Sequence, residues 1–336
     1  MEKLNVAVIG AGIYGIHHVD VYYQNPYVNL IAVCDQSEKI RENIEKNYGL
    51  KTYNNVEDML ENEKIDAASI VTPDHLHVEP ALACIEKGVD LLIEKPLATS
   101  VADCKKIYEA AKKNKVRVAV DFHKRWDPAA IFIYNKLKSS KGYPIRAYMN
   151  MDDIIDVPTE WFKWGGSSDP VDFLGVHCVD LMRWYMDCEA VDVYAVGSKK
   201  LLPSMGVDTY DSVTSIIKFE NGCICTLENS WILPKGFAKN NDGKTSIITS
   251  EELIRIDNQN RGVEIFDKNK LHTPNVFFFN DFHGKVIGFG ADPINFFVDA
   301  LINNKEFVAD VYDGLQAAKL TEAIHRSLES GKIEKI

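Results

Sequence analysis

Three glycines that follow an apolar strand pattern have the spacing of a nucleotide-binding turn. The run LNVAVI leads directly into them, and a helical pattern begins at once. A dinucleotide site needs glycine where the chain turns sharply, where a side chain would block the pyrophosphate, and where helix and strand pack closely. Backbone N–H groups at the start of the helix then hold the phosphates. The residues of this turn that we expect to contact the cofactor are Gly10, Gly12, Ile13, Tyr14 and Gly15.

An acidic residue ends the second strand pattern. Asp35 lies 20 residues after Gly15, where a carboxylate accepts hydrogen bonds from the ribose diol of adenosine. The same carboxylate would repel a 2′-phosphate, so the sequence predicts NAD as the cofactor in preference to NADP. The structural alternative is a glycine turn followed by a solvated aspartate, but strand, turn, helix and acid in this order favour the nucleotide site.

Polar residues also follow the fourth and fifth strand patterns. Open α/β sheets bind ligands at the carboxyl ends of their strands, so we expect these residues to reach the cofactor. They are Thr72, Pro73, His77, Glu94 and Lys95. Lys95 could also exchange a proton, because Pro96 holds it extended and a partly buried amine can act as an acid or base near neutral pH. The alternative is a lysine that pairs with Glu94 in a loop.

These residues require a parallel sheet to position them. From Leu4 to Phe122, short apolar runs alternate with amphipathic stretches of helix length at 36–47, 75–87 and 100–113. Strands this apolar are covered on both faces and joined by right-handed crossovers. We therefore predict an α/β fold whose N-terminal domain, residues 1–122, is a doubly wound parallel sheet of the Rossmann type that binds NAD.

The pattern changes after residue 123. Strand patterns fill 190–266 and include the dipeptide Asn221-Gly222, which suits a tight hairpin. The extended run YPIRAYMNM precedes them. Helical patterns lie at 127–139, 171–187, 292–303 and 310–329. We predict that residues 123–336 form a substrate-binding α+β domain with a large, mainly antiparallel sheet, and that its last helix can pack back on the first domain.

Composition narrows the classes of function. The 336 residues suffice for two domains. With 46% apolar and 26% charged residues, the chain has the composition of an ordinary globular protein. Its 49 acidic and 38 basic residues give a net charge of -11, which disfavours nucleic acid and anionic membranes as partners. We expect a small-molecule substrate instead.

Three further expectations concern location, cysteines and metals. No apolar run is long enough to cross a bilayer and the chain begins without a signal-peptide pattern, so we expect a cytoplasmic protein. The seven cysteines are odd in number and form no CxxC pair, which predicts reduced and mostly buried thiols. His75 and His77 lie two apart on a loop without a matching acid or cysteine cluster, so we expect no metal.

Four motifs carry a resemblance to a known family: VAVIGAGIYG, IVTPDHLH, LLIEKPLA and GVHCVDLMRW. With the closing DGLQAAKLTEAIHRSLESGK, they make essentially the whole chain similar to the glucose-fructose oxidoreductase and inositol dehydrogenase (Gfo/Idh/MocA) family. The resemblance implies a Rossmann domain with a bound nicotinamide cofactor, and an α+β domain whose sheet commonly builds a homodimer or homotetramer. It also implies that Lys95 is the catalytic lysine and that the Lys95–Pro96 bond is cis.

His177 and Asp180 lie three residues apart on the helix predicted at 171–187, so they share a face. The carboxylate of Asp180 can orient the imidazole, and a neutral imidazole is a base for an alcohol proton near neutral pH. The resemblance identifies His177 as the family's catalytic histidine. Taken alone, a histidine on an amphipathic helix is more often a core or surface residue.

One position departs from the family pattern. Many relatives carry an aspartate four residues before the catalytic histidine, and this chain has Phe173 there. The adjacent Asp172 could replace that acid through a shift in the start of the helix, or could be only a charge at the helix N-terminus. The substrate specificity of inositol dehydrogenases therefore does not carry over directly.

Other polar and aromatic residues are candidates for substrate contacts. His123 and Arg125 follow the last Rossmann strand pattern and could hydrogen-bond a polyol or a carboxylate. Trp161 and Trp164 could stack on a sugar face, or could pack their loop down. The full set of expected substrate contacts is Lys95, His123, Arg125, Trp161, Trp164, Asp172 and His177.

Together these predictions describe an NAD-dependent dehydrogenase that acts on a secondary alcohol of a sugar, sugar derivative or cyclitol. In the oxidative direction His177 accepts the hydroxyl proton and Lys95 stabilises the alkoxide. Two alternatives stay open. One is a redox-neutral enzyme that cleaves glycosides by transient oxidation, and the other is a non-enzymatic NAD-sensing regulator. The retention of Lys95, His177 and Asp180 argues against the regulator, since a sensor needs no proton transfer.

Overall fold

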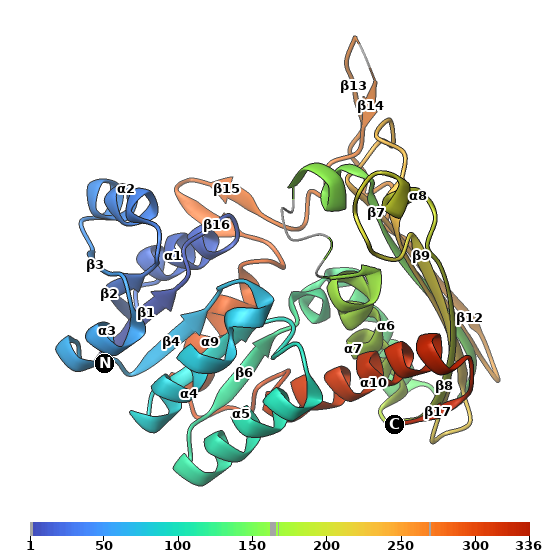
Figure 1. Cartoon of the computed structure of the whole chain (residues 1–336), viewed down its shortest axis with the longest axis horizontal. Coiled ribbons are helices and arrows are strands. Elements are labelled where there is room, and N and C mark those ends of the chain that lie inside the picture. The colour runs from blue at the N-terminus through green and yellow to red at the C-terminus, as the bar shows by residue number, and fades with distance from the viewer. Residues whose placement is uncertain (1–2, 162–165, 167, 269) are drawn as a thin grey trace. The chain divides into compact units, whose positions relative to one another are not determined.

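The computed structural model describes residues 3–161, 166, 168–268 and 270–336 (Figure 1). Contacts divide the chain into two compact units. The first unit consists of Met1–Trp126 and Phe278–Ala318, and the second of Asp127–Phe277 and Lys319–Ile336. The predicted domain boundary between residues 122 and 123 rests on sequence patterns and stays a prediction.

The first unit is built on a six-stranded parallel sheet, as its apolar runs predict. In spatial order its strands are β3 (Lys51–Tyr53), β2 (Val28–Cys34), β1 (Leu4–Ile9), β4 (Ala67–Ile70), β5 (Asp90–Glu94) and β6 (Val118–Asp121). The strand order reverses between β1 and β4, where the loops that follow the two strands lead to opposite faces of the sheet. Open α/β sheets bind their ligands at such a switch point.

Helices cover both faces of this sheet (Figure 1). They are α1 (Gly15–Gln24), α2 (Glu38–Tyr48), α3 (Val56–Asn62), α4 (Val78–Glu86), α5 (Val101–Asn114) and α9 (Asp292–Ile302). Helices α4 and α5 pack side by side, and α1 packs beside α9. Single residues determine where some of these helices begin and end. The Ser100 side chain caps the N-terminus of α5 by accepting a hydrogen bond from Asp103 N, and Gly49 ends α2 with φ +66°.

The core of the first unit explains why its strands are so apolar. All four residues of β4 are buried, because helices cover both faces. Val6, Val8 and Val33 form one cluster with Ile294 and Phe297, which arrive from much later in the chain. The sequence reading missed β3 and α3, because a three-residue edge strand and a two-turn helix are too short to show a period.

The second unit contains a seven-stranded mixed sheet among the described residues. Its strands, in spatial order, are β12 (Leu253–Asp257), β11 (Asn241–Thr249), β7 (Pro144–Ile154), β10 (Ile224–Leu233), β9 (Ser212–Phe219), β8 (Ala190–Ser198) and β17 (Glu334–Lys335). All neighbours are antiparallel except β7 and β10. The predicted hairpin is confirmed: Gly222 has φ +85° in the turn between β9 and β10.

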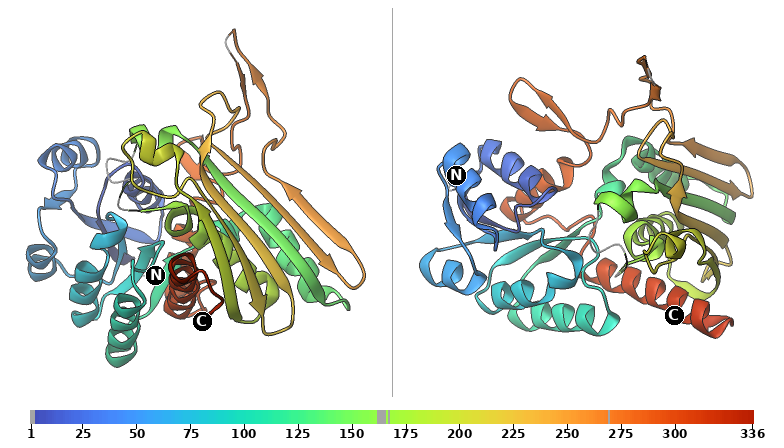
Figure 2. Two further views of the ribbon diagram at one scale, coloured as in Figure 1. Left: turned by 45° about the vertical axis from the view of Figure 1, so that its right-hand side comes forward. Right: turned by 45° about the horizontal axis from the view of Figure 1, so that its top comes forward.

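Two helices, α6 (Pro128–Ser139) and α7 (Val176–Met186), lie on one face of this sheet (Figure 2). The helix predicted at 171–187 begins as a π-helical turn, η5 (Val171–Gly175), before it continues as α7. Pairing places the side chains of five exposed apolar residues together on one face of the sheet. They are Tyr194, Val196, Ile216, Ile224 and Leu253.

The remaining elements are short, apart from the last helix. They are α8 (Leu201–Ser204), β13 (Ile265–Phe266), β14 (Leu271–His272), β15 (Asn280–Phe282), β16 (Lys285–Ile287) and α10 (Val311–Ser330). Residues of α10 belong to both units, and Gly331 follows the helix with φ +66°, as the sequence predicts.

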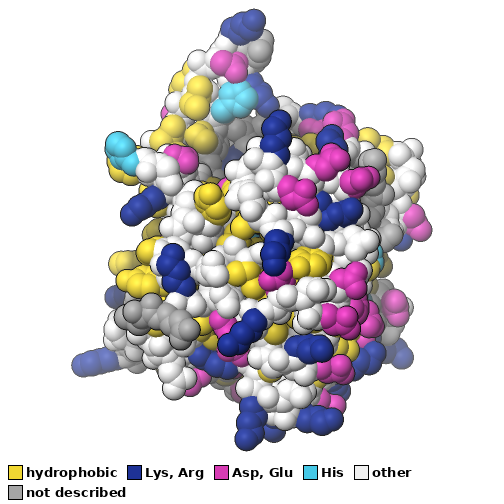
Figure 3. All heavy atoms as spheres, turned by 90° about the vertical axis from the view of Figure 1, so that its left-hand side faces the viewer, with side chains coloured by type: hydrophobic (Ala, Val, Ile, Leu, Met, Phe, Trp, Pro, Cys, Tyr) yellow, Lys and Arg dark blue, Asp and Glu magenta, His cyan; other side chains and the backbone are white. Residues whose placement is uncertain are grey.

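Three further features concern the cysteines, the apolar character of the helices and the charges on the surface. The seven cysteines are free and all except Cys188 are buried, which confirms the predicted thiols. Among the described residues, no helix combines the length and apolar character that a membrane span requires. On the face shown in Figure 3, basic and acidic side chains are interspersed.

The close approach of α10 to the sheet predicts an effect on stability. A Cβ atom at Gly314 would lie 2.8 Å from Leu97 Cβ and 2.9 Å from Val120 Cγ2. Alanine favours a helix over glycine by about 1 kcal/mol, but overpacking of this size costs about 1–3 kcal/mol. We expect Gly314→Ala to lower the melting temperature by a few degrees in a thermal scan. Gly236→Ala is the matched control, because nothing lies within 4 Å of the added atom, and an equal shift in both variants would contradict the packing argument.

Candidate functional site

Two of the three glycines after β1 are required by the backbone itself. Gly10 has φ +87°, and a Cβ atom there would lie 2.6 Å from Val71 O. A Cβ atom at Gly15 would lie 2.1 Å from Gly10 O, so α1 can start this close to the turn only with glycine. A Cβ atom at Gly12 would meet nothing within 4 Å. Gly12 therefore borders open space, which is what a turn that admits a pyrophosphate needs.

Two side chains beside this turn fit a bound ligand. Ile13 is 88% exposed although it is apolar. Thr72 Oγ1 is buried and has no hydrogen-bond partner among the described residues. A buried hydroxyl rarely stays unsatisfied, so both features fit a group that lies against the turn between β1 and β4.

Asp35 lies directly against the glycine turn. Its Oδ2 accepts a hydrogen bond from Ala11 N at 2.9 Å, and its Oδ1 accepts one from Ser37 N at 2.8 Å. These two bonds fix the carboxylate at the end of β2, and each oxygen keeps a lone pair for a ribose hydroxyl. The structure thus brings together the glycines and the acid that the sequence predicts for a dinucleotide site.

Lys95 follows β5 in a turn that the rest of the first unit supports. Its side chain is 9% exposed, and the Lys95–Pro96 bond is cis, as the resemblance implies. The two ring nitrogens of His77 lie 2.8 Å from Pro96 O and 2.9 Å from Thr72 O. His77 is fully buried between these carbonyl groups, so its side chain ties the turn to the loop after β4, and the cofactor contact predicted for it stays a prediction. Pro73 lies exposed in the same loop.

A buried group of titratable side chains surrounds Lys95 within the first unit. Tyr14 Oη lies 3.3 Å from His123 Nδ1. Burial lowers the pKa of His123 to about 3, and burial with the carboxylates of Glu94 and Asp121 raises the pKa of Tyr14 well above its usual value. Both rings are therefore uncharged near neutral pH. A cluster of perturbed groups at the carboxyl ends of parallel strands is typical of a functional site.

Aromatic rings from the second segment of the first unit pack against this group. The ring centroid of Phe278 lies 5.3 Å from that of His123 and 6.4 Å from that of Tyr14. Phe279 stacks on His17 at 4.3 Å. The sequence alone did not connect these phenylalanines to the glycine turn, because most strands of the second sheet lie between them in the sequence.

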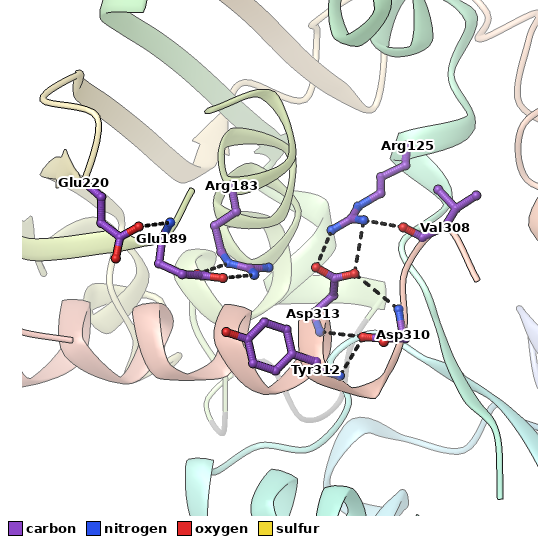
Figure 4. A network of polar contacts seen from close by, with 8 residues as sticks. All are labelled: Arg125, Arg183, Glu189, Glu220, Val308, Asp310, Tyr312 and Asp313. Atoms are coloured by element: carbon purple, nitrogen blue, oxygen red, sulfur yellow. Dashed lines mark hydrogen bonds and ion pairs between the residues drawn. The ribbon is translucent and has the colours of Figure 1, made fainter. Parts of the chain in front are cut away.

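Arg125 contacts the segment that leads into α10. It lies in the 3₁₀ turn η2 (His123–Trp126) and is 3% exposed. Its Nη2 pairs with Asp313 Oδ1 at 3.1 Å and its Nη1 donates to Val308 O (Figure 4). These contacts hold the start of α10 against the turn after β6, and the substrate contact predicted for Arg125 stays a prediction.

In the second unit, His177 and Asp180 lie on the first turns of α7. They are 5% and 1% exposed, so both are enclosed by protein. Phe173, in the place of the expected aspartate, packs its ring 5.9 Å from the ring of Trp231. Trp161 ends the π-helical turn η3 (Val157–Trp161) and is 48% exposed. Trp164 lies outside the described residues.

Asp172 faces a histidine that the sequence reading did not single out. His325 Nε2 lies 2.8 Å from Asp169 Oδ2 and 3.7 Å from Asp172 Oδ1. Burial would lower the pKa of His325, but the bond to Asp169 and the charge of Asp172 outweigh it and raise the pKa to about 9. These residues border a cavity of about 470 Å³ that is also lined by Lys199, Thr209 and Tyr210.

The site residues therefore form two groups, one in each unit. The first contains the glycine turn, Asp35 and the surroundings of Lys95, and the second contains His177, Asp180 and Asp172. That Lys95 and His177 meet over one ring stays a prediction. Two clusters of described residues have ligand atoms close enough for a metal ion: His18 with Glu94 and Asp121, and His325 with Asp169 and Asp172.

Both units match known protein families. Residues 4–122 match the model of an oxidoreductase family with an NAD-binding Rossmann fold, and residues 144–255 match the Gfo/Idh/MocA C-terminal domain. The cofactor that the glycine turn and Asp35 predict is thereby confirmed as NAD.

Individual relatives agree with these matches. The inositol 2-dehydrogenase of Rubrobacter xylanophilus is 26% identical over 62% of this chain and 60% of that protein. The scyllo-inositol 2-dehydrogenase (NAD(+)) of Bacillus subtilis is 26% identical over 76% of this chain and 74% of that protein. The crystal structure of scyllo-inositol dehydrogenase from Lactobacillus casei, with NAD(H) and scyllo-inositol bound, has a TM-score of 0.84 at 18% identity and covers 99% of both chains. It shows the same fold.

The position of Asp35 predicts its effect on cofactor choice. Asp35→Ser removes the charged acceptor for the ribose diol, and loss of a hydrogen bond to a charged group is worth about 1.5–3 kcal/mol. We expect the affinity for NADH to fall about tenfold or more and the preference over NADPH to weaken, as measured by isothermal titration with both nucleotides. Gln36→Ser, at the exposed neighbour, should leave both affinities unchanged. An unaltered ratio of the two affinities in Asp35→Ser would remove the assigned role.

The ion pair of His325 predicts a pH-dependent stability. Its pKa in the folded chain is raised to about 9, so the stabilisation is fully present below the unfolded value of about 6.5 and is lost as the pH rises through about 9. We expect His325→Gln to melt below the wild type near pH 6, by an effect on the order of 2 kcal/mol, and the gap to close toward pH 10. His272→Gln removes an exposed pair with Asp267 and should show no such trend. A gap for His325→Gln that is constant with pH would contradict the charged pair.

Proposed function

Because this chain belongs to the Gfo/Idh/MocA family of NAD-binding oxidoreductases, we propose that it transfers hydride between nicotinamide and a secondary alcohol or ketone of a sugar, sugar derivative or cyclitol. The family membership confirms the resemblance that the motifs carry. Relatives named as inositol dehydrogenases support this class of substrate.

The observation that carries the proposal is the burial of Lys95 in the NAD-binding unit. A lysine that is 9% exposed at the carboxyl end of β5 is an unusual placement for a side chain with only a structural role. The turn that bears it is held by His77, and uncharged His123 lies among its neighbours. An ammonium group in such a place can stabilise the negative oxygen that forms when an alcohol loses its proton.

In the proposed oxidation, the substrate loses a proton from oxygen and a hydride from carbon and becomes a ketone. Bound NAD supplies the acceptor for the hydride. His177 accepts the hydroxyl proton, Asp180 positions its imidazole, and Lys95 stabilises the alkoxide and can relay the proton onward. In the reductive direction, NADH returns the hydride to the ketone carbon and His177 returns the proton to its oxygen.

Substrate specificity in this proposal differs from that of relatives with an acid four residues before the histidine. Phe173 packs on Trp231, and Asp172 faces His325. We therefore assign the remaining hydroxyl contacts to His123 and Asp172, and stacking on an apolar sugar face to Trp161 and Trp164.

The apolar face of the second unit's sheet supports a homodimer or homotetramer. Ile216 is 49% exposed and Val196 is 51% exposed, and pairing aligns them with Tyr194, Ile224 and Leu253. Contiguous exposed apolar side chains on one surface are typical of a protein interface.

Replacement of the lysine tests the proposal. We expect Lys95→Ala to lower kcat by about a hundredfold or more, while the affinity for NADH, measured by fluorescence titration, stays close to that of the wild type. Lys105→Ala, at an exposed position of α5, is the matched control.

The assay uses myo-inositol, scyllo-inositol, free hexoses and p-nitrophenyl glycosides, and follows NADH and organic product separately. NADH formation supports the dehydrogenase. Glycoside cleavage without NADH would point to the redox-neutral alternative, and NAD binding without any turnover would point to the regulator. Wild-type rates in Lys95→Ala would remove the mechanism.

A further inference from the structure

Two acidic residues end neighbouring strands in the interior of the first unit. Glu94 is the last residue of β5 and Asp121 the last of β6, and the parallel pairing places them opposite one another. Glu94 is 7% exposed and Asp121 is fully buried. Two ionised carboxylates at this spacing would repel each other strongly away from water, so the pair needs a neutralising partner.

His18 of α1 is the third member of this cluster. Its Nε2 lies 3.6 Å from Glu94 Oε1 and 3.6 Å from Asp121 Oδ2, and the ring is fully buried. On its other side, Nδ1 lies 3.1 Å from Ser69 Oγ, which lies 2.6 Å from Tyr22 Oη. The imidazole is therefore held from both sides, and it faces both carboxyl groups.

Four polar atoms of the cluster lack hydrogen-bond partners among the described residues. They are His18 Nε2, Glu94 Oε1, and both carboxyl oxygens of Asp121. In native proteins, buried polar atoms are nearly always satisfied, and exceptions point to an unseen proton, water or ion. The ligand atoms of the three residues lie within 4.8 Å of one another, so one small positive species would satisfy them.

The charges around the cluster favour different states for the two acids. Burial opposes the ionisation of Glu94, but the hydrogen bond and charge of His18, together with the charge of Lys95, outweigh it and lower the pKa of Glu94. Burial and the neighbouring Glu94 raise the pKa of Asp121 well above its usual value. The other titratable groups that face the pair are the phenols of Tyr14 and Tyr22, and burial keeps both uncharged.

We propose that Glu94 and Asp121 share one proton and serve as a positioning pair for Lys95, an inference that rests on the function proposed above. Asp121 donates its proton to Glu94, so the pair carries a single negative charge beside the ammonium of Lys95. The other oxygen of Glu94 accepts from Lys95 N at 3.1 Å, which ties the charge to the lysine's own backbone. Two charges would leave the acids in repulsion, whereas a single charge avoids that repulsion and keeps a negative group beside Lys95.

A divalent cation is the competing occupant, since histidine and carboxylates are ligands for zinc. The proton is favoured because the positive charge of Lys95 already lies beside Glu94, which weakens attraction for a second cation. A shared proton also satisfies one oxygen of each acid without further ligands.

Infrared difference spectroscopy of the protein with NAD bound tests the shared proton without any substrate. At neutral pH, wild type minus Asp121→Asn should contain the carbonyl band of one protonated carboxylic acid. Wild type minus Glu94→Gln should contain the lost carboxylate bands and a shift of the Asp121 carbonyl band, without net loss of a protonated acid. Asp90→Asn is the matched control, because Asp90 is the first residue of β5 and Glu94 is the last. The wild type minus Asp90→Asn spectrum should contain only carboxylate bands.

Kinetics with myo-inositol and NAD(+) test the positioning role. At saturating NAD(+), we expect Glu94→Gln to lower kcat by about a hundredfold. Asp121→Asn, which keeps a donor toward Glu94, should retain more activity than Asp121→Ala and should change the alkaline limb of the kcat profile. Asp90→Asn should leave kcat and its pH profile unchanged.

Each outcome decides. If the wild type minus Asp121→Asn spectrum lacks the band of a protonated acid, the shared proton is overturned. Elemental analysis gives a second test: one metal ion per chain in the wild type and none in Asp121→Asn would also overturn it. If Asp121→Asn does not fold, the Glu94→Gln spectrum still tests the proposal. A net loss of a protonated-acid band in Glu94→Gln would show that Glu94 itself carries the proton and would overturn the proposal. A band as expected with no turnover of any compound would leave the pair intact and count only against the proposed function.

Discussion

The strands of the first sheet all run in one direction, so their carboxyl ends share one edge. Gly10, Asp35, Thr72 and Lys95 follow four different strands and reach this edge together. The contact between the first turn of α1 and Gly10 O admits no side chain at Gly15, so α1 can begin this close to the glycine turn only with glycine there. The cofactor site and the surroundings of the lysine both depend on that constraint.

Burial then decides which groups at this edge carry charge. His123 and Tyr14 are uncharged because the interior disfavours their ions. Neighbouring His18 and Lys95 lower the pKa of Glu94 against the effect of burial, whereas burial and Glu94 raise the pKa of Asp121. Electrostatic effects on a reacting oxygen are large at buried positions such as that of Lys95.

The second unit keeps one sequence pattern of the family and departs from another. His177 and Asp180 keep their spacing on α7, while the preceding residues form a π-helical turn. Phe173 turns to Trp231, and Asp172 joins His325 and Asp169. Such local rearrangements alter the polar groups available to a ligand while the sheet and helices remain in place.

The glycine turn, Asp35, the parallel sheet and the hairpin at Gly222 were all predictable, because each depends on a local pattern: backbone freedom, strand period or a dipeptide with positive φ. The role of Arg125 was not, since its partner Asp313 lies 188 residues away. The same holds for His18, which is unremarkable in a helix until α1 packs against β5 and β6. The sequence by itself determined the elements and the cofactor turn. Only the tertiary structure decided which side chains are buried and which charged groups lie close together. Burial and charge pairing depend on distances in space, and residue spacing along the chain does not give those distances.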